Sequence, residues 1–597
     1  MFKKISFALL LAAVFVGCSV EQLPPMETFA EAEDPSPLTA EELAAWDNVK
    51  PGLNGAWATI DSLYSRSIVP QVAPVKTMRL SGWRGERISA QILLWTADGA
   101  DGVRVDIAPL KGDKEEIPAE MPYVQSRFVR YTLADKSDAH CLCNRKKDHP
   151  VVLVPDMLDT LSHYDMPAKT VRPVWISLKL PMSADGGIYK STVTVTDNNG
   201  DKVRLPLEVE ICCETLNEPE HWTFHLDLWQ HPAAIARAEG LELWSDEHFE
   251  AIKRNCRMLQ AAGQKVITTT LNKDPWNHQC YDAYEDMIKW TLKKDGTWSY
   301  DYTIFDRVIK TMMEVGIYRY INCYSMLPWN YELDYFDEAK GEKVTVKAKP
   351  GTPIFEKMWG PFLTDFYRHI DKDLMIASGV NIAADEREPE DMDEAIRVLN
   401  KYAPELHFAM ADNKYSFRKY TNVRDVCIAL RQPIEESDFE MRHKANYFTT
   451  FYVCCSTHFP NTLTYSQPFE AELLPWLSLA RGFDGMLRWA YNSWPENPQY
   501  DSRFAKFASG DTYFIYPFAR SSVRFERMID GIEAYEKAKV LMYDFTVSNR
   551  AKRLEPLNKV LEVMRTTTPQ DKTQPWNEIV REARKALEDI SRRTENE

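Results

Sequence analysis

The sequence predicts a multidomain protein in which an N-terminal β-sandwich precedes a (β/α)8 (TIM) barrel and a C-terminal helical extension. Three observations support this prediction. A chain of 597 residues is too long for one hydrophobic core, which indicates two or three domains. Residues from about 50 to 215 read as strands and show no helical periodicity. After residue 218, apolar segments of strand length alternate with amphipathic helices.

The first 18 residues are expected to form a lipoprotein signal peptide. A basic start, MFKK, precedes an apolar segment, Phe7 to Gly17, that has the length of a signal-peptide core and is too short to span a bilayer. The segment ends in Phe15-Val16-Gly17-Cys18, which resembles a bacterial lipobox and implies lipidation of Cys18. Phe15 replaces the usual Leu, so a plain secretory signal remains open. We expect an exported protein, lipid-anchored to a bacterial membrane, periplasmic or at the cell surface.

Residues 19–48 are expected to form a tether between the lipid and the folded part. They are rich in Pro, Glu and Ala and lack periodicity. The whole chain has a formal net charge of −16 and no long basic run. This charge argues against binding to nucleic acid or to an anionic membrane surface. Membrane contact is therefore expected only through the N-terminal lipid.

Residues 49–218 are expected to form the β-sandwich domain. Asp197-Asn198-Asn199-Gly200 is a hairpin turn signal between two alternating strands. The strand-like segments are MRLSGWRGERISAQILLW, GVRVDIAPL, RPVWISLKLPM and YKSTVTVTDNNGDKVRLPLEVEI.

Residues 219–525 are expected to form the barrel, because they contain eight candidate strands over about 270 residues. These strands are FHLDLW (224–229), KVITTTL (265–271), YRYINCY (318–324), GVNIAAD (379–385), LHFAMAD (406–412), DVCIALR (425–431), NYFTTFYVCC (446–455) and GMLRWAY (485–491). Helices are predicted near 246–260, 304–315 and 395–402 from apolar residues at helical spacing. Residues 526–597 are expected to be helical, and the last helix has an apolar stripe from Ile579 to Ile590.

A cysteine and histidine cluster raises the question of a metal. His140, Cys141, Cys143 and His149 provide ligand types that bind zinc, but their spacing matches no common zinc finger. We expect no metal and no cofactor. The remaining cysteines are compatible with disulfides in an exported protein, but spacing does not reveal their pairing.

Polar and aromatic side chains gather at the ends of the predicted strands, where the catalytic groups of this barrel fold lie. Acids and amides bind hydroxyl groups, and rings stack on the apolar face of a pyranose, so this combination fits a sugar pocket. The strand ends carry Trp229-Gln230-His231, Asn322-Cys323-Tyr324, Asp385-Glu386-Arg387, Asp412-Asn413 with Tyr415, and Arg488-Trp489-Ala490-Tyr491-Asn492-Ser493-Trp494.

The adjacent acids Asp385 and Glu386 form an unusual pair. A retaining glycosidase normally places two carboxyl groups about 5–5.5 Å apart on opposite faces of the scissile bond. Neighbouring strand residues diverge, so this pair fits nucleophile plus acid poorly. It fits a mechanism in which the 2-acetamido oxygen of the substrate attacks, one carboxylate orients the acetamido N–H and the other protonates the leaving oxygen. The alternative is a solvated acidic loop, since EREPED continues with more acids.

Several segments together resemble glycoside hydrolase family 123, the β-N-acetylgalactosaminidases that use substrate-assisted catalysis. The resemblance covers about residues 50 to 545. It is carried by NIAADEREP, YVCCSTHFPNT, ARGFDGMLRWAYNSWPENP, GDTYFIYP and SSVRFERMIDGIEAYEKAKVL.

The resemblance implies a retaining exo-enzyme that removes terminal β-linked N-acetylgalactosamine without a metal. It implies that Asp385 orients the acetamido group and that Glu386 is the general acid/base. The matching segment indicates sugar-binding roles for Trp489, Tyr491, Asn492 and Trp494. Strand-end position adds Tyr324, His231, Asn413 and Tyr415 as further substrate-binding candidates, although a buried core role is an alternative for each aromatic residue.

Two alternatives remain open at this stage. An exo-β-N-acetylglucosaminidase differs in substrate only at the C4 hydroxyl, and one hydrogen bond to that group is enough to discriminate. A non-catalytic surface glycan-binding lipoprotein would present a sugar groove on an inactive barrel. The intact pair of Asp385 and Glu386 favours the enzyme, because a binding protein has no use for two carboxylates that repel each other.

Overall fold

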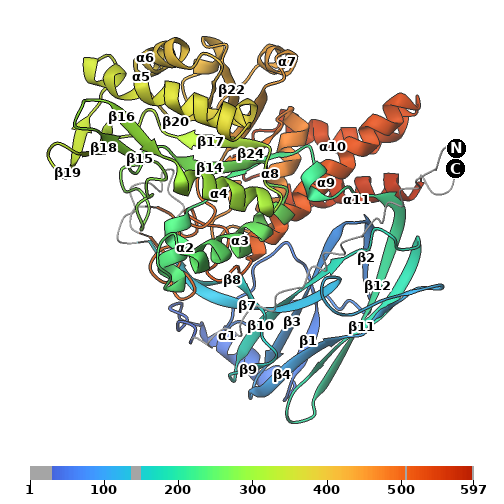
Figure 1. Cartoon of the computed structure of the whole chain (residues 1–597). Helices are drawn as coiled ribbons and strands as arrows, with labels where there is room; N and C mark the ends of the chain where they lie inside the picture. Colours follow the sequence, from blue (N-terminus) through green and yellow to red (C-terminus); the bar gives the residue numbers. More distant parts are fainter. Residues whose placement is uncertain (1–29, 136–148, 505–506, 594–597) are drawn as a thin grey trace, which may run out of the picture.

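A computed structural model describes residues 30–135, 149–504 and 507–593, in which a β domain packs against a barrel and its C-terminal helices (Figure 1). The expected signal peptide, Cys18 and the residues His140, Cys141 and Cys143 lie outside the described residues. Within the described ranges, no helix combines the length and the apolar character needed to cross a membrane.

The β domain is a sandwich of two sheets, as predicted. One sheet has the order β1 (Asn54–Ala58), β3 (Arg87–Thr96), β10 (Thr170–Lys179), β7 (Val124–Asp135), β8 (Val151–Asp159). The other has the order β2 (Met78–Arg84), β12 (Lys202–Thr215), β11 (Gly187–Thr196), β4 (Ala100–Ile107), β9 (Tyr164–Met166), with the short strands β5 (Leu110–Lys111) and β6 (Glu116–Ile117) beside it. Strands β11 and β12 pair antiparallel around residues 197–201, which confirms the predicted hairpin.

The first sheet is covered on both faces, which explains the continuous apolar run ISAQILLW in β3. Ile92 and Leu94 face the second sheet in the sandwich core. Leu93 lies on the opposite face and packs with Trp46 and Val171 in a separate apolar cluster. A strand that buries both faces has no reason to alternate polar and apolar residues.

Eight parallel strands form the barrel, and all eight coincide with the predicted segments. Their order in the sheet is β13 (His225–Leu228), β24 (Gly485–Arg488), β23 (Phe448–Tyr452), β22 (Val423–Ala429), β21 (His407–Ala411), β20 (Val380–Asp385), β17 (Tyr320–Tyr324) and β14 (Val266–Thr270).

The barrel closes between β13 and β14 largely through side-chain amides. The backbone contributes a single isolated bridge, between Leu226 and Gln264. The Gln264 side chain accepts from the Leu228 N–H at 3.0 Å and donates to the Val266 carbonyl at 2.7 Å. The Gln230 side chain accepts from the Thr268 N–H at 2.9 Å. These glutamines satisfy backbone groups that a short ladder leaves without partners.

Helices follow the strands around the barrel, and the helices predicted near 246–260, 304–315 and 395–402 are present. They are α2 (Pro232–Glu239), α3 (Asp246–Ala261), α4 (Thr303–Glu314), α5 (Pro353–Arg368), α6 (Pro389–Tyr402), α7 (Glu436–Lys444), α8 (Pro468–Arg481) and α9 (Val523–Val547). A small sheet with the order β16 (Trp298–Asp301), β15 (Lys289–Leu292), β18 (Glu332–Asp337), β19 (Glu342–Lys347) is inserted after β14 and β17.

The C-terminal extension is helical, as expected, and contains α10 (Glu555–Thr566) and α11 (Trp576–Arg593). The predicted start of this extension at residue 526 falls inside α9, so this boundary is wrong. Helix α9 follows β24 and packs on α8, and it continues into the C-terminal helices after one short turn. In Figure 1, α11 passes beside the end of β12, so the extension contacts both domains.

The expected tether, 19–48, is packed over its described part, and the prediction is wrong there. Glu31 binds Arg172 at 2.6 Å and Arg130 at 2.9 Å, and all three side chains are buried. Burial raises the pKa of Glu31, but the two guanidinium groups lower it more, to about 2. Helix α1 (Ala40–Ala45) follows and begins with a capping box in which Thr39 and Glu42 bind reciprocally. The composition of this segment did not reveal these specific partners.

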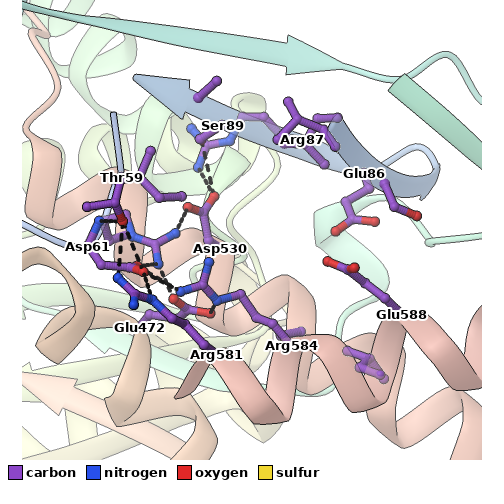
Figure 2. A pocket seen from close by; sticks show the side chains of 18 of the residues that line it. Thr59, Asp61, Glu86, Arg87, Ser89, Glu472, Asp530, Arg581, Arg584 and Glu588 are labelled. Atoms are coloured by element: carbon purple, nitrogen blue, oxygen red, sulfur yellow. Dashed lines mark hydrogen bonds and ion pairs between the residues drawn. The ribbon is translucent and has the colours of Figure 1, made fainter. Parts of the chain in front are cut away.

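Ion pairs of the buried Asp61 join the β domain to α9 and α11, and Glu472 of α8 belongs to the same network (Figure 2). Asp61 of the β domain is 2% exposed and accepts from Arg527 at 3.0 Å. It also accepts from Arg581 at 3.0 Å and Arg584 at 2.8 Å, both of α11. Arg584 also binds Glu472 of α8 at 3.1 Å. Breaking a buried pair on one side leaves an uncompensated charge, so these groups oppose separation of the two domains.

Glu526 of α9 is a second anchor, because it binds Arg127 at 3.0 Å and also pairs with Arg87. Burial raises the pKa of Glu526, but Arg127 and Arg87 lower it more, to about 2. An unfolded glutamate titrates near 4.3. The stabilisation from Glu526 is therefore complete above about pH 4.3 and is lost as the pH falls toward 2.

Glu526→Gln is expected to lower the free energy of unfolding by about 3 kcal/mol at pH 7, because two arginines lose their buried partner. The difference from wild type should shrink toward pH 3. Urea unfolding at several pH values, with the exposed Glu242→Gln as control, measures both effects. A pH-independent difference, or a loss no larger than that of the control, would contradict this account.

Candidate active site

A cavity of about 750 Å³ opens at the carboxyl ends of the barrel strands. Inward-facing positions alternate along each strand, so the last one or two of them border the cavity. Small residues at several of these positions, among them Ala411, Ala429 and Cys454, leave the space open. The lining consists of Trp229, Gln279, Trp329, Asp385, Glu386, Ala411, Asn413, Tyr415, Ala429, Arg431, Gln432, Tyr452, Cys454, Cys455, Ser456, Leu487, Trp489 and Phe507.

Three buried rings form an aromatic floor, and one of them, Trp229, lines the cavity itself. The centroid of Trp229 lies 4.8 Å from Trp276 and 4.6 Å from Tyr324, and those two rings are 4.9 Å apart. Tilted ring pairs at these separations stabilise each other beyond simple burial. This packing holds the Trp276 indole close to the acid on β20.

Asp385 is the last residue of β20 and is half-buried. The Trp276 indole N–H donates to its Oδ2 at 3.0 Å. Burial and the neighbouring Glu386 charge raise the pKa of Asp385 to about 7, although the hydrogen bond from Trp276 opposes this rise. This carboxyl group therefore keeps its proton to a higher pH than an ordinary aspartic acid does.

Glu386 adopts a left-handed backbone conformation, with φ of +47°. Its N–H donates to the Ala411 carbonyl at 2.9 Å, which keeps the backbone attached to β21. An extended residue at this position would point its side chain away from that of Asp385. The left-handed turn breaks the alternation, and both side chains line the same cavity. Such a conformation costs about 1 kcal/mol in a residue with a Cβ, and it is found at functional sites.

Tyr452 at the end of β23 fixes the Glu386 carboxylate, because its hydroxyl donates to Oε1 in a short hydrogen bond. Burial and the Glu386 charge raise the pKa of Tyr452 far above its usual value. The hydroxyl therefore stays protonated and remains a donor. The two acids thus have separate donors, Trp276 for Asp385 and Tyr452 for Glu386.

A third inward acid, Asp227 on β13, lies below the aromatic floor. It accepts from the Asn322 amide at 3.3 Å, and Asn322 accepts from Asn381 at 2.9 Å. Burial and Asp425 raise the pKa of Asp227 to about 7. Asp227 does not line the cavity, so Asp385 and Glu386 are the two carboxylates that a ligand meets among the described lining residues.

Three of the predicted sugar-binding residues line the cavity with the acid pair: Trp489, Asn413 and Tyr415. The Trp489 indole donates to Asp511 at 3.2 Å, and Asp511 also binds the buried Arg488 at 3.0 Å. The Tyr415 hydroxyl donates to the Pro433 carbonyl at 2.8 Å. Both rings are therefore held in fixed positions.

The other five predicted residues lie away from the lining. Tyr324 belongs to the buried floor. His231 begins α2 and exchanges hydrogen bonds with Asn492 at 2.9 and 3.0 Å, and burial lowers the pKa of His231 to about 3. Tyr491 donates to Asn255 at 2.9 Å, and Trp494 donates to Ile515 at 2.5 Å. The Tyr491 and Trp494 side chains are buried and bonded within the fold, and neither lines the cavity.

Sequence reasoning missed four residues: Trp276, Trp329, Tyr452 and Arg431. Tyr452 lies in a predicted strand, in the second position after the inward-facing Thr450. Because inward-facing residues alternate along a barrel strand, the sequence pattern of β23 already predicts that Tyr452 faces the cavity. Trp276 and Trp329 come from long segments after β14 and β17, where no periodicity indicates the direction of a side chain.

Cys455 at the cavity is disulfide-bonded. Across the described ranges, no group of three or more His, Cys, Asp or Glu side chains is placed to hold a metal ion.

The fold and the paired carboxylates in an aromatic-lined cavity define a glycoside hydrolase. The profile of the glycoside hydrolase 123 catalytic domain matches residues 229–541, and the profile of the glycoside hydrolase 123 N-terminal domain matches residues 57–197. The chain belongs to glycoside hydrolase family 123.

Comparison with solved structures agrees with this fold. A family 123 glycoside hydrolase from Clostridium perfringens, described for hydrolysis of glycolipid glycans, superposes with a TM-score of 0.80 and 23% identity, over 91% of this chain and 99% of that chain. A GH5 xyloglucanase from Bacteroides ovatus gives a TM-score of 0.27 with 11% identity, over 80% of this chain and 100% of that chain. This second likeness is too weak to carry an argument. A search of curated proteins returned no match.

Asp385→Asn is expected to stabilise the folded protein at pH 8. The folded pKa of about 7 lies above the unfolded value of about 3.9, so stability falls as the pH rises between these values. Asn carries no charge and removes this penalty, by about 1–2 kcal/mol for a half-buried group. Urea unfolding at pH 4 and pH 8 tests this, with the exposed Asp106→Asn as control. Equal stability of variant and wild type at pH 8 would contradict the raised pKa.

Proposed function

We propose that this glycoside hydrolase is a retaining exo-β-N-acetylgalactosaminidase that uses the 2-acetamido group of its substrate as the nucleophile. One observation carries the proposal: the two carboxylates that line the cavity, Asp385 and Glu386, are neighbours in the chain. Neighbouring acids are poorly suited to lie on opposite faces of one glycosidic bond, as a double displacement with an enzyme nucleophile requires. A nucleophile supplied by the substrate removes this requirement.

Asp385 is the group that orients the acetamido N–H and stabilises the positive charge that develops on it. It is less exposed than Glu386 and accepts a hydrogen bond from the Trp276 indole. An N–H donated to Asp385 favours its ionised form and lowers its pKa. Substrate binding therefore favours the carboxylate form of Asp385 that this role requires.

Glu386 is the general acid that protonates the leaving oxygen, and in the second half-reaction it is the base that activates water. Its side chain is exposed at the cavity, where the leaving group departs. The Tyr452 hydroxyl positions this carboxyl group. Glu386 as the proton donor and Asp385 as the carboxylate supply the two groups that the reaction needs.

The sugar itself is expected to stack on Trp489 or Trp329, which line the cavity, and to bind Asn413 through a hydroxyl group. A terminal β-linked N-acetylgalactosamine is the proposed substrate unit. The second candidate is β-N-acetylglucosamine, since the two sugars differ only at C4. Family membership disfavours a non-catalytic binding protein.

We also propose that the protein is exported and anchored through a lipid on Cys18, a residue outside the described structure. The proposal rests on the signal-like sequence of residues 1–18. Incorporation of a radiolabelled fatty acid that is lost in Cys18→Ser would support it, and absence of label from the wild type would contradict it.

Release of nitrophenol from the β-N-acetylgalactosaminide, the β-N-acetylglucosaminide and the β-galactoside tests the proposed function. We expect cleavage of the first, at least tenfold weaker cleavage of the second, and none of the third. Cleavage of the galactoside would contradict substrate assistance, because that sugar has no acetamido group. Preference for the glucosaminide would favour the second candidate.

Glu386→Gln is expected to lower kcat/KM by about 10²–10⁴-fold on a β-N-acetylgalactosaminyl disaccharide, because a sugar leaving group needs a proton. The loss on the nitrophenyl glycoside should be smaller, since nitrophenolate leaves without protonation. Steady-state kinetics on both substrates measure the difference. An equal loss on both would argue against an acid role for Glu386.

A further inference from the structure

Arg431 is the one cationic side chain among the described residues that line the cavity. It lies in the turn that follows β22, and its side chain is exposed. The Gln432 N–H closes this turn on the Ala429 carbonyl at 2.7 Å, and the Leu430 N–H binds the Tyr452 carbonyl at 3.0 Å. The backbone that carries Arg431 is therefore fixed to the strand that holds Tyr452, the partner of Glu386.

Arg431 forms no ion pair and no side-chain hydrogen bond with any residue in the described ranges. Other arginines at this end of the barrel each have an acid. Arg387 binds Asp391 at 3.4 Å, and Arg418 binds Asp438 at 2.7 Å. The buried Arg488 binds Asp511 at 3.0 Å. An arginine that lines the same cavity as two carboxylates, but has no partner of its own, is available to a ligand.

The position of Arg431 places it on the leaving-group side of the proposed site. In the barrel order, β21 lies between β22 and β20, and β20 carries the acids. Ala429, the last residue of β22, pairs with Tyr452, whose hydroxyl binds Glu386. Arg431 follows Ala429 toward the opening of the cavity. The exposed Glu386 delivers its proton to the leaving oxygen, so the group beyond that oxygen extends toward this opening.

We propose that Arg431 binds an oxyanion, a carboxylate or a sulfate ester, carried by the part of the glycan that leaves. This inference rests on the proposed function, because Glu386 defines the leaving-group side. A guanidinium group binds such oxyanions with two parallel hydrogen bonds. Without Arg431, an anionic glycan would meet only Asp385 and Glu386 as charged groups in the cavity of a protein with a net charge of −16. Arg431 is thus a specificity-determining residue for acidic glycans.

Four disaccharides test the proposal. Each has N-acetylgalactosamine β-linked to O4 of a second sugar, which is galactose, galactose 3-sulfate, galactose 6-sulfate or galacturonate. We expect the wild type to cleave at least one acidic disaccharide with a kcat/KM about 5–20-fold above that of the neutral one. The sulfated and carboxylated arms identify the oxyanion. The preference should decrease in 0.5 M NaCl, because salt screens an exposed ion pair.

Arg431→Gln should reduce the ratio of kcat/KM for acidic to neutral disaccharide to about one or below. Arg431→Lys should retain part of the ratio, since it keeps the charge but loses the planar fork. The control is Lys310→Gln, which removes one positive charge from the exposed face of α4 and should leave the ratio unchanged. A ratio of one or below for every acidic disaccharide in the wild type, or a ratio retained in Arg431→Gln, would overturn the inference.

The two proposals fail in different ways. Cleavage of the neutral disaccharide with no preference for an acidic one removes only the role of Arg431. Failure to cleave any of the four disaccharides or the nitrophenyl N-acetylgalactosaminide removes the proposed function and this inference with it.

Discussion

The left-handed backbone at Glu386 is the constraint on which the site depends. A strand that simply continued past Asp385 would turn the next side chain away from it. With φ of +47°, the chain instead brings two consecutive carboxylates into one cavity. Their repulsion contributes to the raised pKa of Asp385, and each acid has its own aromatic donor, Trp276 or Tyr452. The left-handed backbone and the repulsion between the two carboxylates each cost free energy, and both lie at the proposed catalytic pair.

Interactions at the cavity and farther away hold this backbone conformation in place. The Ala411 carbonyl ties Glu386 to β21. Trp489, on the opposite wall, is fixed by Asp511, and the segment after Asp511 leads into α9. Helix α9 is in turn bound to the β domain through buried ion pairs of Glu526 and Arg527. The β domain therefore supports the barrel by packing against the helix that follows the site.

Much of this architecture was visible in the sequence. Eight apolar segments were correctly predicted as barrel strands because a buried strand leaves a short, recognisable apolar run. The acid pair was found because it lies directly at a strand end. The left-handed backbone conformation that brings both carboxylates into the cavity was not predicted, because a glutamate residue does not indicate a positive φ. Trp276 and Trp329 lie on long connections whose paths are set by tertiary packing, and Glu31 finds its arginines about 100 residues or more away. Tyr491 and Trp494 lie in the segment that carries the family resemblance, but they are buried.

The most direct test of the central claim is a series of nitrophenyl β-N-acetylgalactosaminides in which the acetyl methyl carries zero, one, two or three fluorine atoms. Fluorine withdraws electron density from the amide oxygen and weakens it as a nucleophile, with little change in size. If the acetamido oxygen attacks the anomeric carbon, kcat/KM should fall steeply and steadily along the series, by several orders of magnitude overall. A rate that is nearly independent of fluorination would show that the enzyme supplies the nucleophile, and would contradict the proposed roles of Asp385 and Glu386.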